Sequence, residues 1–435
     1  MIDELKSGIV RSAIFHTPRN AFQSNTSLEM FADGALVMEA GRIVALGDFS
    51  QVRRLHPSVP VHDLSGGFVL PGFIDTHVHY PQTRIIGGLG YSLLEWLNKH
   101  ALPEELRMVG RDYAAAVASE FLHALASHGT TAALVFGSHF VPAMELLFDA
   151  AIASGQRIVS GLVVSDRVLP TGLLQTPDQA YLGNNELIRR IRNHRNLGYA
   201  VTPRFALSAS DAMLEVCQTL LKENPASLFQ THINENLHEM AEVQALFPDA
   251  GDYLGVYEQF NLTESRSILA HNLHPTGSEL ARMAASKVSV AHCPCSNAAL
   301  GSGLFPMRRH LEAQVHFALG TDVGAGTGFG MLKEGLQAYL LQRIHGEGFS
   351  LTPEQLLYLA TRAGAEALGL EEETGDFSIG KSADFVYLRP LSGSPLAAAV
   401  AHADSATQIL ASLFTLGDSH CVKEVRVSGR VIYQS

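Results

Sequence analysis

Histidine and carboxylate side chains that could hold a metal ion lie at the ends of short, β-favouring runs. His77 and His79 end one such run, and in an extended strand their alternate spacing points both imidazoles to the same side. His232, His271 and Asp322 lie at the ends of three later runs. Imidazole nitrogens with one carboxylate suit zinc, iron or another first-row ion. We predict that His77, His79, His232 and Asp322 close on one ion, with His271 nearby and a position open for water.

The residues around this predicted ion could carry out hydrolysis. Water held by such an ion becomes a nucleophile near neutral pH and needs groups that accept and donate protons. Asp322 can be both ligand and proton acceptor, and His271 can orient or deprotonate the same water. Glu235 follows His232 by three residues and could shuttle protons over a substrate, or could simply be a carboxylate favoured at a helix start. We predict hydrolysis at a polarised carbon, with an amine, amide or halide leaving.

The cysteines offer a second possible zinc site, which we reject. Cys293 and Cys295 have one residue between them, whereas structural zinc sites use gaps of two to four residues and a second pair of ligands. The Pro-Cys-x-x-Cys signature of the other zinc deaminases also fails after Cys295. Core or loop thiols are the better interpretation. His292 remains open between a core residue and a partner of the metal site.

Strands that could bring these side chains together recur through the middle of the chain. Eight apolar, β-favouring runs are found there: Phe73–Tyr80, Thr130–Gly137, Arg157–Asp166, Tyr199–Ser208, Leu228–Glu235, Ser267–Leu273, Lys287–Pro294 and Val315–Asp322. Helical periodicity fills several gaps, in Glu104–Ser127, Ala143–Ser154 and Leu214–Glu223. This alternation predicts an α/β fold, a (β/α)8 TIM barrel whose strand ends meet around one mouth. A doubly wound sheet is the alternative, but no Gly-x-Gly-x-x-Gly or P-loop supports it.

Both ends of the chain are rich in β signals. Two hairpins are predicted, one around Gly41 and one at Ser428-Gly429, and a strand is predicted over 383–388. We therefore expect residues 1–70 and 375–435 to form one small β-sandwich domain, and residues 71–374 to form the barrel.

Composition narrows the partners and the compartment. The chain has 435 residues with 31 Lys+Arg against 43 Asp+Glu, and no basic cluster suits nucleic acid. Four cysteines suggest a reducing compartment. No signal peptide is visible in the first residues, and no apolar run is long enough to span a membrane. We expect a cytoplasmic protein that acts on a small molecule.

Several motifs together resemble those of a known family. The barrel with its Pro71–His79 segment resembles the amidohydrolase superfamily, and more specific stretches resemble the guanine deaminases. These stretches are His79-Tyr-Pro-Gln82, Ser92-Leu-Leu-Glu-Trp-Leu97, Val201-Thr-Pro-Arg-Phe-Ala-Leu-Ser208, Thr231-His-Ile-Asn-Glu-Asn236, Ala291-His-Cys-Pro-Cys-Ser-Asn297 and Gly320-Thr-Asp-Val-Gly-Ala-Gly326. They spread over the whole barrel, so the resemblance covers essentially the full chain.

The resemblance implies a function and a role for each site residue. It implies a homodimer that converts guanine to xanthine and ammonia in purine catabolism. One zinc would be held by the four predicted ligands, His271 would assist the water, and Glu235 would protonate the purine ring and the departing ammonia. Gln82 and Arg204 would recognise the guanine edge, and Phe205 would pack on the ring. The donor fork of Arg204 matches the O6/N7 acceptors of guanine and would face a donor in adenine.

Other readings remain open. The substrate could instead be 8-oxoguanine, S-adenosylhomocysteine, adenosine or cytosine, and the metal site alone would also permit halide displacement from a triazine. Iron could replace zinc. A non-catalytic scaffold that kept the fold is a different class of function, and an empty metal site would favour it. Phe205 could be plain core packing, and the sequence does not settle whether Trp96 and Cys295 touch a substrate.

Overall fold

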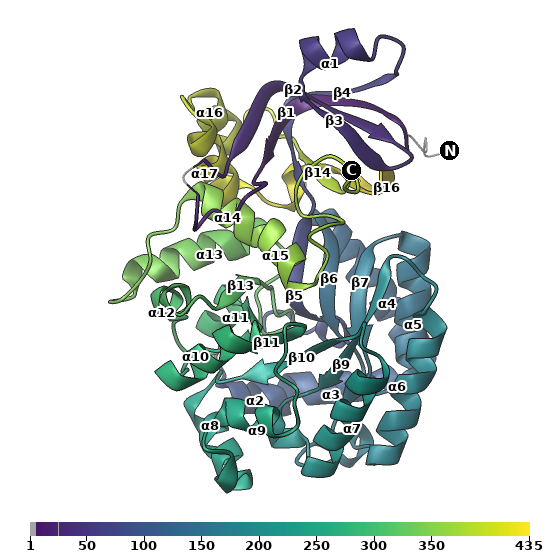
Figure 1. Cartoon of the computed structure of the whole chain (residues 1–435), viewed down its shortest axis with the longest axis vertical. Coiled ribbons are helices and arrows are strands. Elements are labelled where there is room, and N and C mark those ends of the chain that lie inside the picture. The colour runs from purple at the N-terminus through teal and green to yellow at the C-terminus, as the bar shows by residue number, and fades with distance from the viewer. Residues whose placement is uncertain (1–5, 25) are drawn as a thin grey trace.

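The computed structural model describes residues 6–24 and 26–435, and its larger part is a barrel of parallel strands (Figure 1). The strands follow one another around the barrel in chain order, as predicted. They are β5 (Phe73–His79), β6 (Thr130–Phe136), β7 (Arg157–Gly161), β9 (Leu197–Pro203), β10 (Leu228–Ile233), β11 (Ser267–His271), β12 (Ser289–His292) and β13 (His316–Leu319), with the short β8 (Val163–Val164) paired to β9. The expectation of a (β/α)8 barrel is confirmed.

The barrel closes between its last and first strands, next to the predicted metal ligands. The backbone N–H of Asp322 donates to the carbonyl of His77 at 2.8 Å, and the N–H of His79 donates to the carbonyl of Val323 at 2.8 Å. The buried Asp75 carboxylate reinforces this seam, because it accepts hydrogen bonds from the backbone N–H of Thr321 (3.0 Å) and from its hydroxyl (2.5 Å). Burial raises the pKa of Asp75 to about 7.

Helices cover the outside of the barrel because each has one apolar face. In α7 (Asp211–Glu223) the buried residues Met213, Leu214, Cys217 and Leu220 follow helical spacing, and Ser210 caps its start. Further helices that follow the first barrel strand are α4 (Arg111–Ser127), α5 (Val141–Ser154), α6 (Pro177–Ile191), α8 (Leu237–Leu246), α9 (Tyr253–Gln259), α10 (Gly277–Ser286), α11 (Pro294–Ala299), α12 (Met307–Glu312), α13 (Met331–Ile344), α14 (Pro353–Ala360) and α15 (Arg362–Ala367).

One predicted helix is divided. The stretch predicted as helical over Glu104–Ser127 consists of α3 (Leu102–Leu106), a 3-10 turn, and α4. Gly110 separates the parts because its backbone is extended, with ψ of 112°. The division leaves α3, together with α2 (Leu93–Trp96), over the mouth of the barrel, where both can contribute to a site (Figure 1).

The two ends of the chain build the small β domain, as predicted, in the form of a seven-stranded sheet. Its order is β16-β15-β14-β4-β1-β2-β3, so β4 lies between a strand from each end of the chain. The strands are β1 (Gly8–His16), β2 (Glu29–Glu39), β3 (Arg42–Asp48), β4 (Val61–Pro71), β14 (Phe385–Leu388), β15 (Val422–Val427) and β16 (Arg430–Gln434). Both predicted hairpins are present, and Gly41 is needed because a Cβ there would lie 2.3 Å from the carbonyl oxygen of Ser428.

Both faces of this sheet are apolar. Val10 and Leu36 face one core, and their neighbours Ile9 and Val37 face a second core to which α1 (Phe49–Leu55) contributes Val52. Two further helices, α16 (Pro395–Ala401) and α17 (Ala406–Leu416), lie near the C-terminal end of the chain.

Two predictions about the ends of the chain are not tested by the structure. The domain division at residues 70 and 375 stays a prediction. The expected lack of a signal peptide concerns a segment whose first five residues lie outside the described residues. Within the described ranges, no helix combines the length and apolarity needed to span a bilayer.

A buried ion pair joins the barrel to the sheet, and breaking it should destabilise the protein. Arg157 at the start of β7 donates from Nε to Asp384 at 2.6 Å, and both side chains are buried. We expect Asp384→Ala to lower the free energy of unfolding by about 3 kcal/mol, because the guanidinium loses its main partner while Glu373 stays 3.5 Å away. The midpoint of urea denaturation would measure this loss.

The matched control is an exposed carboxylate that also pairs with an arginine. Asp149 accepts two hydrogen bonds from Arg190 at 2.7 and 2.8 Å, but its side chain is 54% exposed. Because exposed ion pairs contribute about 0–1 kcal/mol, Asp149→Ala should barely move the midpoint. Equal losses in the two variants would contradict a structural role for the buried pair.

Candidate active site

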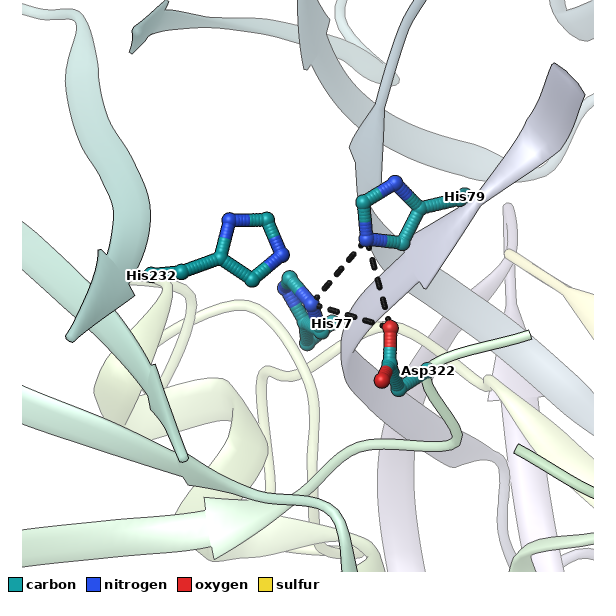
Figure 2. A group of neighbouring side chains, drawn as sticks. All are labelled: His77, His79, His232 and Asp322. Carbon is teal, nitrogen blue, oxygen red and sulfur yellow. Dashed lines mark hydrogen bonds and ion pairs between the residues drawn. The ribbon is translucent and has the colours of Figure 1, made fainter. Parts of the chain in front are cut away.

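Four predicted metal ligands converge at the mouth of the barrel. Each of His77, His79, His232 and Asp322 offers a ligand atom, and these atoms all lie within 4.8 Å of one another (Figure 2). The Nε2 atoms of His77 and His79 are 3.2 Å apart, and they lie 3.3 and 3.2 Å from Oδ1 of Asp322. The structure therefore brings together the whole predicted ligand set, from strand β5, strand β10 and the loop after β13.

The spacing and chemistry of these donors fit a metal ion. Four ligands placed about 2.0–2.1 Å from an ion in a tetrahedron are about 3.3 Å apart, which matches the three distances among His77, His79 and Asp322. Burial lowers the pKa of all three histidines, to about 4 for His79, so the imidazoles are neutral and can coordinate. Nδ1 of His232 lies 2.6 Å from the carbonyl oxygen of Arg204, and a hydrogen bond there leaves Nε2 free for the ion.

Asp322 is held by more than the histidines. Burial alone would raise its pKa, but contacts with His77 and His79 hold that pKa well below its usual range. Ser296 donates to Oδ2 at 2.5 Å, which leaves Oδ1 directed at the histidines. A negatively charged, oriented carboxylate is what a cation at this position requires.

His271 and Glu235 face each other beside the ligand group. Nε2 of His271 lies 3.4 Å from Oε2 of Glu235 and 3.9 Å from Oδ2 of Asp322, while Nδ1 is 2.9 Å from Oδ1 of Asn297. Both side chains are buried, and burial raises the pKa of Glu235 well above its usual range. Asn236, not Glu235, caps α8, and Glu235 lines the pocket instead of the helix surface.

The predicted substrate residues line one pocket over the ligand group. Gln82 follows β5 in a 3-10 turn, and Arg204 and Phe205 follow β9. The pocket is lined by His79, Gln82, Leu93, Trp96, Leu97, Arg204, Phe205, His232, Glu235, Leu300, Asp322 and Ala325. Trp96 from α2 is therefore part of this pocket, which the sequence left open. The Gly-rich turn after β13 lies close to Gln82, since the N–H of Gly324 donates to Oε1 of Gln82 at 3.1 Å.

Glu105 is a site residue to which no sequence motif pointed. This carboxylate in α3 accepts two hydrogen bonds from Nη1 of Arg204, at 2.6 and 2.7 Å, and one from Nε2 of Gln82 at 2.7 Å. It is 3% exposed, and Nδ1 of His139 lies 3.6 Å from it. A Glu-Glu pair in a helical stretch is ordinarily a solvated face, so no signal in the sequence singled out Glu105.

Three further residues near the site, Phe136, His292 and Cys295, pack against or bond to neighbouring residues. Phe136, which the sequence analysis did not single out, packs between the ligand histidines, with ring centroids 4.6 Å from both His79 and His232. His292 is buried and stacks on Phe305 at 4.3 Å, outside the residues that line the pocket. Cys295 is also buried, and its backbone N–H donates to Glu334 at 3.1 Å.

The fold and the site define a class of protein. The chain belongs to the amidohydrolase family, whose pattern matches residues 68–432. Within that family, several relatives that match nearly the whole chain carry the name guanine deaminase. The chain is 55% identical to a probable guanine deaminase of Deinococcus radiodurans, with 98% of each chain covered. The structure superposes on Escherichia coli guanine deaminase with a TM-score of 0.95 at 37% identity, covering 98% of this chain and 99% of that one.

One of the similar solved structures contains a bound ligand. Guanine deaminase from C. acetobutylicum, with guanine bound in its active site, matches with a TM-score of 0.91 at 25% identity. The match covers 98% of this chain and all of the other. The similarity thus extends over both domains, as the sequence resemblance implied.

Proposed function

We propose that this protein hydrolyses guanine to xanthine and ammonia. The observation that carries the proposal is the pocket in which Arg204 and Gln82 lie over the group formed by three histidines and Asp322. The 55% identity to a probable guanine deaminase over nearly the whole chain supports it. The reaction consumes one water: its oxygen replaces the amino group of the purine and stays as the new carbonyl oxygen of xanthine, while the amino group leaves as ammonia.

We assign one Zn²⁺ per chain to His77, His79, His232 and Asp322. Three neutral imidazoles and one carboxylate are a donor set that zinc accepts, and iron accepts the same set. When bound, such an ion lowers the pKa of water toward neutrality and so supplies a nucleophile at physiological pH.

The protein's own side chains account for substrate binding and proton transfer. Arg204 donates to the O6/N7 edge of guanine, Gln82 holds the same end of the ring, and Phe205 packs against its face. Glu235 gives a proton to the ring nitrogen beside the reacting carbon and passes a second one to the departing ammonia. His271, held by Asn297, orients the attacking water and accepts its proton together with Asp322.

The remaining expectations follow from this function. The reaction belongs to purine catabolism, and we assign the protein to the cytoplasm because its four cysteines do not form a disulfide framework. We assign it a homodimeric state, which the resemblance to guanine deaminases implies. Size-exclusion chromatography with light scattering would show a mass near twice 46.9 kDa, and a monomer would contradict the assignment.

The test of the proposed function is ammonia release by the zinc-loaded protein. Guanine, 8-oxoguanine, adenine, cytosine and S-adenosylhomocysteine should be offered separately under the same conditions. We expect ammonia and xanthine from guanine, and far lower rates from the others, because adenine presents a donor where Arg204 needs an acceptor. Faster release from another base would keep the hydrolytic chemistry and contradict the assignment of Arg204 and Gln82. No release from any of them, with zinc bound, would leave the hydrolase class standing and contradict the assignment of a nucleobase substrate, whereas a protein that binds no metal would favour the scaffold interpretation.

A further inference from the structure

Glu105 connects the two side chains that we assign to the guanine edge. Its carboxylate accepts from Nη1 of Arg204 through both oxygens and from Nε2 of Gln82 through one. The other end of the Gln82 amide is also engaged, because Oε1 accepts from the N–H of Gly324. Both ends of Gln82 are thereby fixed, so its amide cannot rotate without breaking one of these bonds.

The same contact neutralises the guanidinium at the recognition end of the pocket. Among the described residues that line the pocket, Arg204 is the single lysine or arginine, and its side chain is 3% exposed. Burial alone would raise the pKa of Glu105, but Arg204 holds it below its usual value, so the two groups form an ion pair. His139 adds no charge, because burial lowers its pKa to about 4. Arg204 and Glu105 together are therefore neutral.

We propose that Glu105 is a positioning residue that aims Arg204 and Gln82 at an uncharged purine and, by neutralising Arg204, keeps small anions out of the recognition end of the pocket. This inference rests on the proposed function. Glu105 does not line the pocket and acts through the two residues that do. Nη1 of Arg204 is occupied by the carboxylate, so Nε and Nη2 would be the donors to a ligand.

The test compares Glu105→Gln with Glu104→Gln. Glu104 is the neighbouring buried carboxylate of α3, but it pairs with Tyr113 and Arg107 and not with Arg204. In Glu105→Gln we expect the KM for guanine to rise at least about tenfold while kcat falls far less, because hydrogen bonds to a charged group are lost. Glu104→Gln should keep the parent KM.

A second measurement follows the exposed charge and needs no turnover. Without Glu105, the Arg204 guanidinium can form a bidentate pair with a carboxylate. Sodium formate should therefore inhibit Glu105→Gln at least about tenfold more strongly than the parent and should raise its melting temperature, whereas uncharged formamide should do neither. Sodium chloride would hold the ionic strength constant. Because the thermal shift is measurable in a protein that does not deaminate guanine, it separates this inference from the proposed function.

Two results would overturn the inference. One is an equal rise in KM in the Glu104 and Glu105 variants, which would indicate a general disturbance of α3. The other is formate binding to Glu105→Gln that is no tighter than binding to the parent. If Glu105→Gln does not fold, Glu105→Asp withdraws the carboxylate by one methylene, and the same KM and formate measurements then decide.

Discussion

Glu235→Gln is expected to lower kcat for guanine deamination by about 10²–10⁴-fold, the usual contribution of a general acid or base. The amide has nearly the shape of the carboxyl group but cannot pass a proton to the ring or to ammonia. Glu235 is outside the group of metal ligands, so the variant should retain its ion. Ammonia release gives kcat, and elemental analysis of the same sample gives the metal content.

A matched control lies on the helix that follows. Glu242 in α8 is 42% exposed and pairs with His238, so Glu242→Gln should retain full activity. If Glu235→Gln with bound metal kept activity within tenfold of the parent, the proton transfer would have to be assigned to another group. The nearest candidate would be His271, whose Nε2 lies 3.4 Å from Glu235.

His232→Ala is expected to remove both the metal ion and the activity. Loss of an outer partner of a ligand typically costs about 10–100-fold in metal affinity, so loss of the ligand itself should cost more. His232 supplies the ligand from β10, and it lies on the opposite side of the ligand group from His79 and Asp322 (Figure 2). Its loss leaves the donors of His77, His79 and Asp322, which lie 3.2–3.3 Å from one another and would have to hold an ion without a fourth ligand. Metal content after dialysis would measure the effect independently of turnover.

His238→Ala is the control for this variant. His238 follows shortly after His232 in the chain, in α8, but it is exposed and contacts Glu242 instead of the ligand group. We expect it to keep about one ion per chain, like the parent. A His232→Ala protein that binds one ion as tightly as the parent would place the metal elsewhere in the chain.

The barrel could be predicted from the sequence because eight apolar runs alternate with helical stretches through the middle of the chain. The eight apolar runs are buried on both faces, so they lack the alternation of a half-buried sheet and stand out from the amphipathic helices between them. The ligands His77, His79 and Asp322 were predictable because strand spacing and strand ends place them without any knowledge of loops.

The other features of the site depend on contacts between segments that are far apart in the chain, and residue spacing does not reveal such contacts. Glu105 is buried because α3 folds over the barrel mouth and meets Arg204, which is 99 residues away in the chain. Nothing near Glu105 distinguishes it from Glu104. The break at Gly110, which positions α3, depends on one extended residue inside a helical pattern. Such features appear only once tertiary packing selects among local alternatives that are nearly equal in energy.

The seven-stranded sheet has a consequence for how the protein is made. Strand β4 pairs with β1 near the start of the chain and with β14 more than 300 residues later, and the barrel closes only when the segment around Asp322 reaches β5. While a ribosome is still synthesising the chain, β4 and β5 each keep an unpaired edge. Contacts that are so distant in sequence form slowly, and exposed strand edges favour aggregation. Neither domain can therefore be completed before most of the polypeptide has emerged, and chaperones that shield strand edges would matter most during that interval.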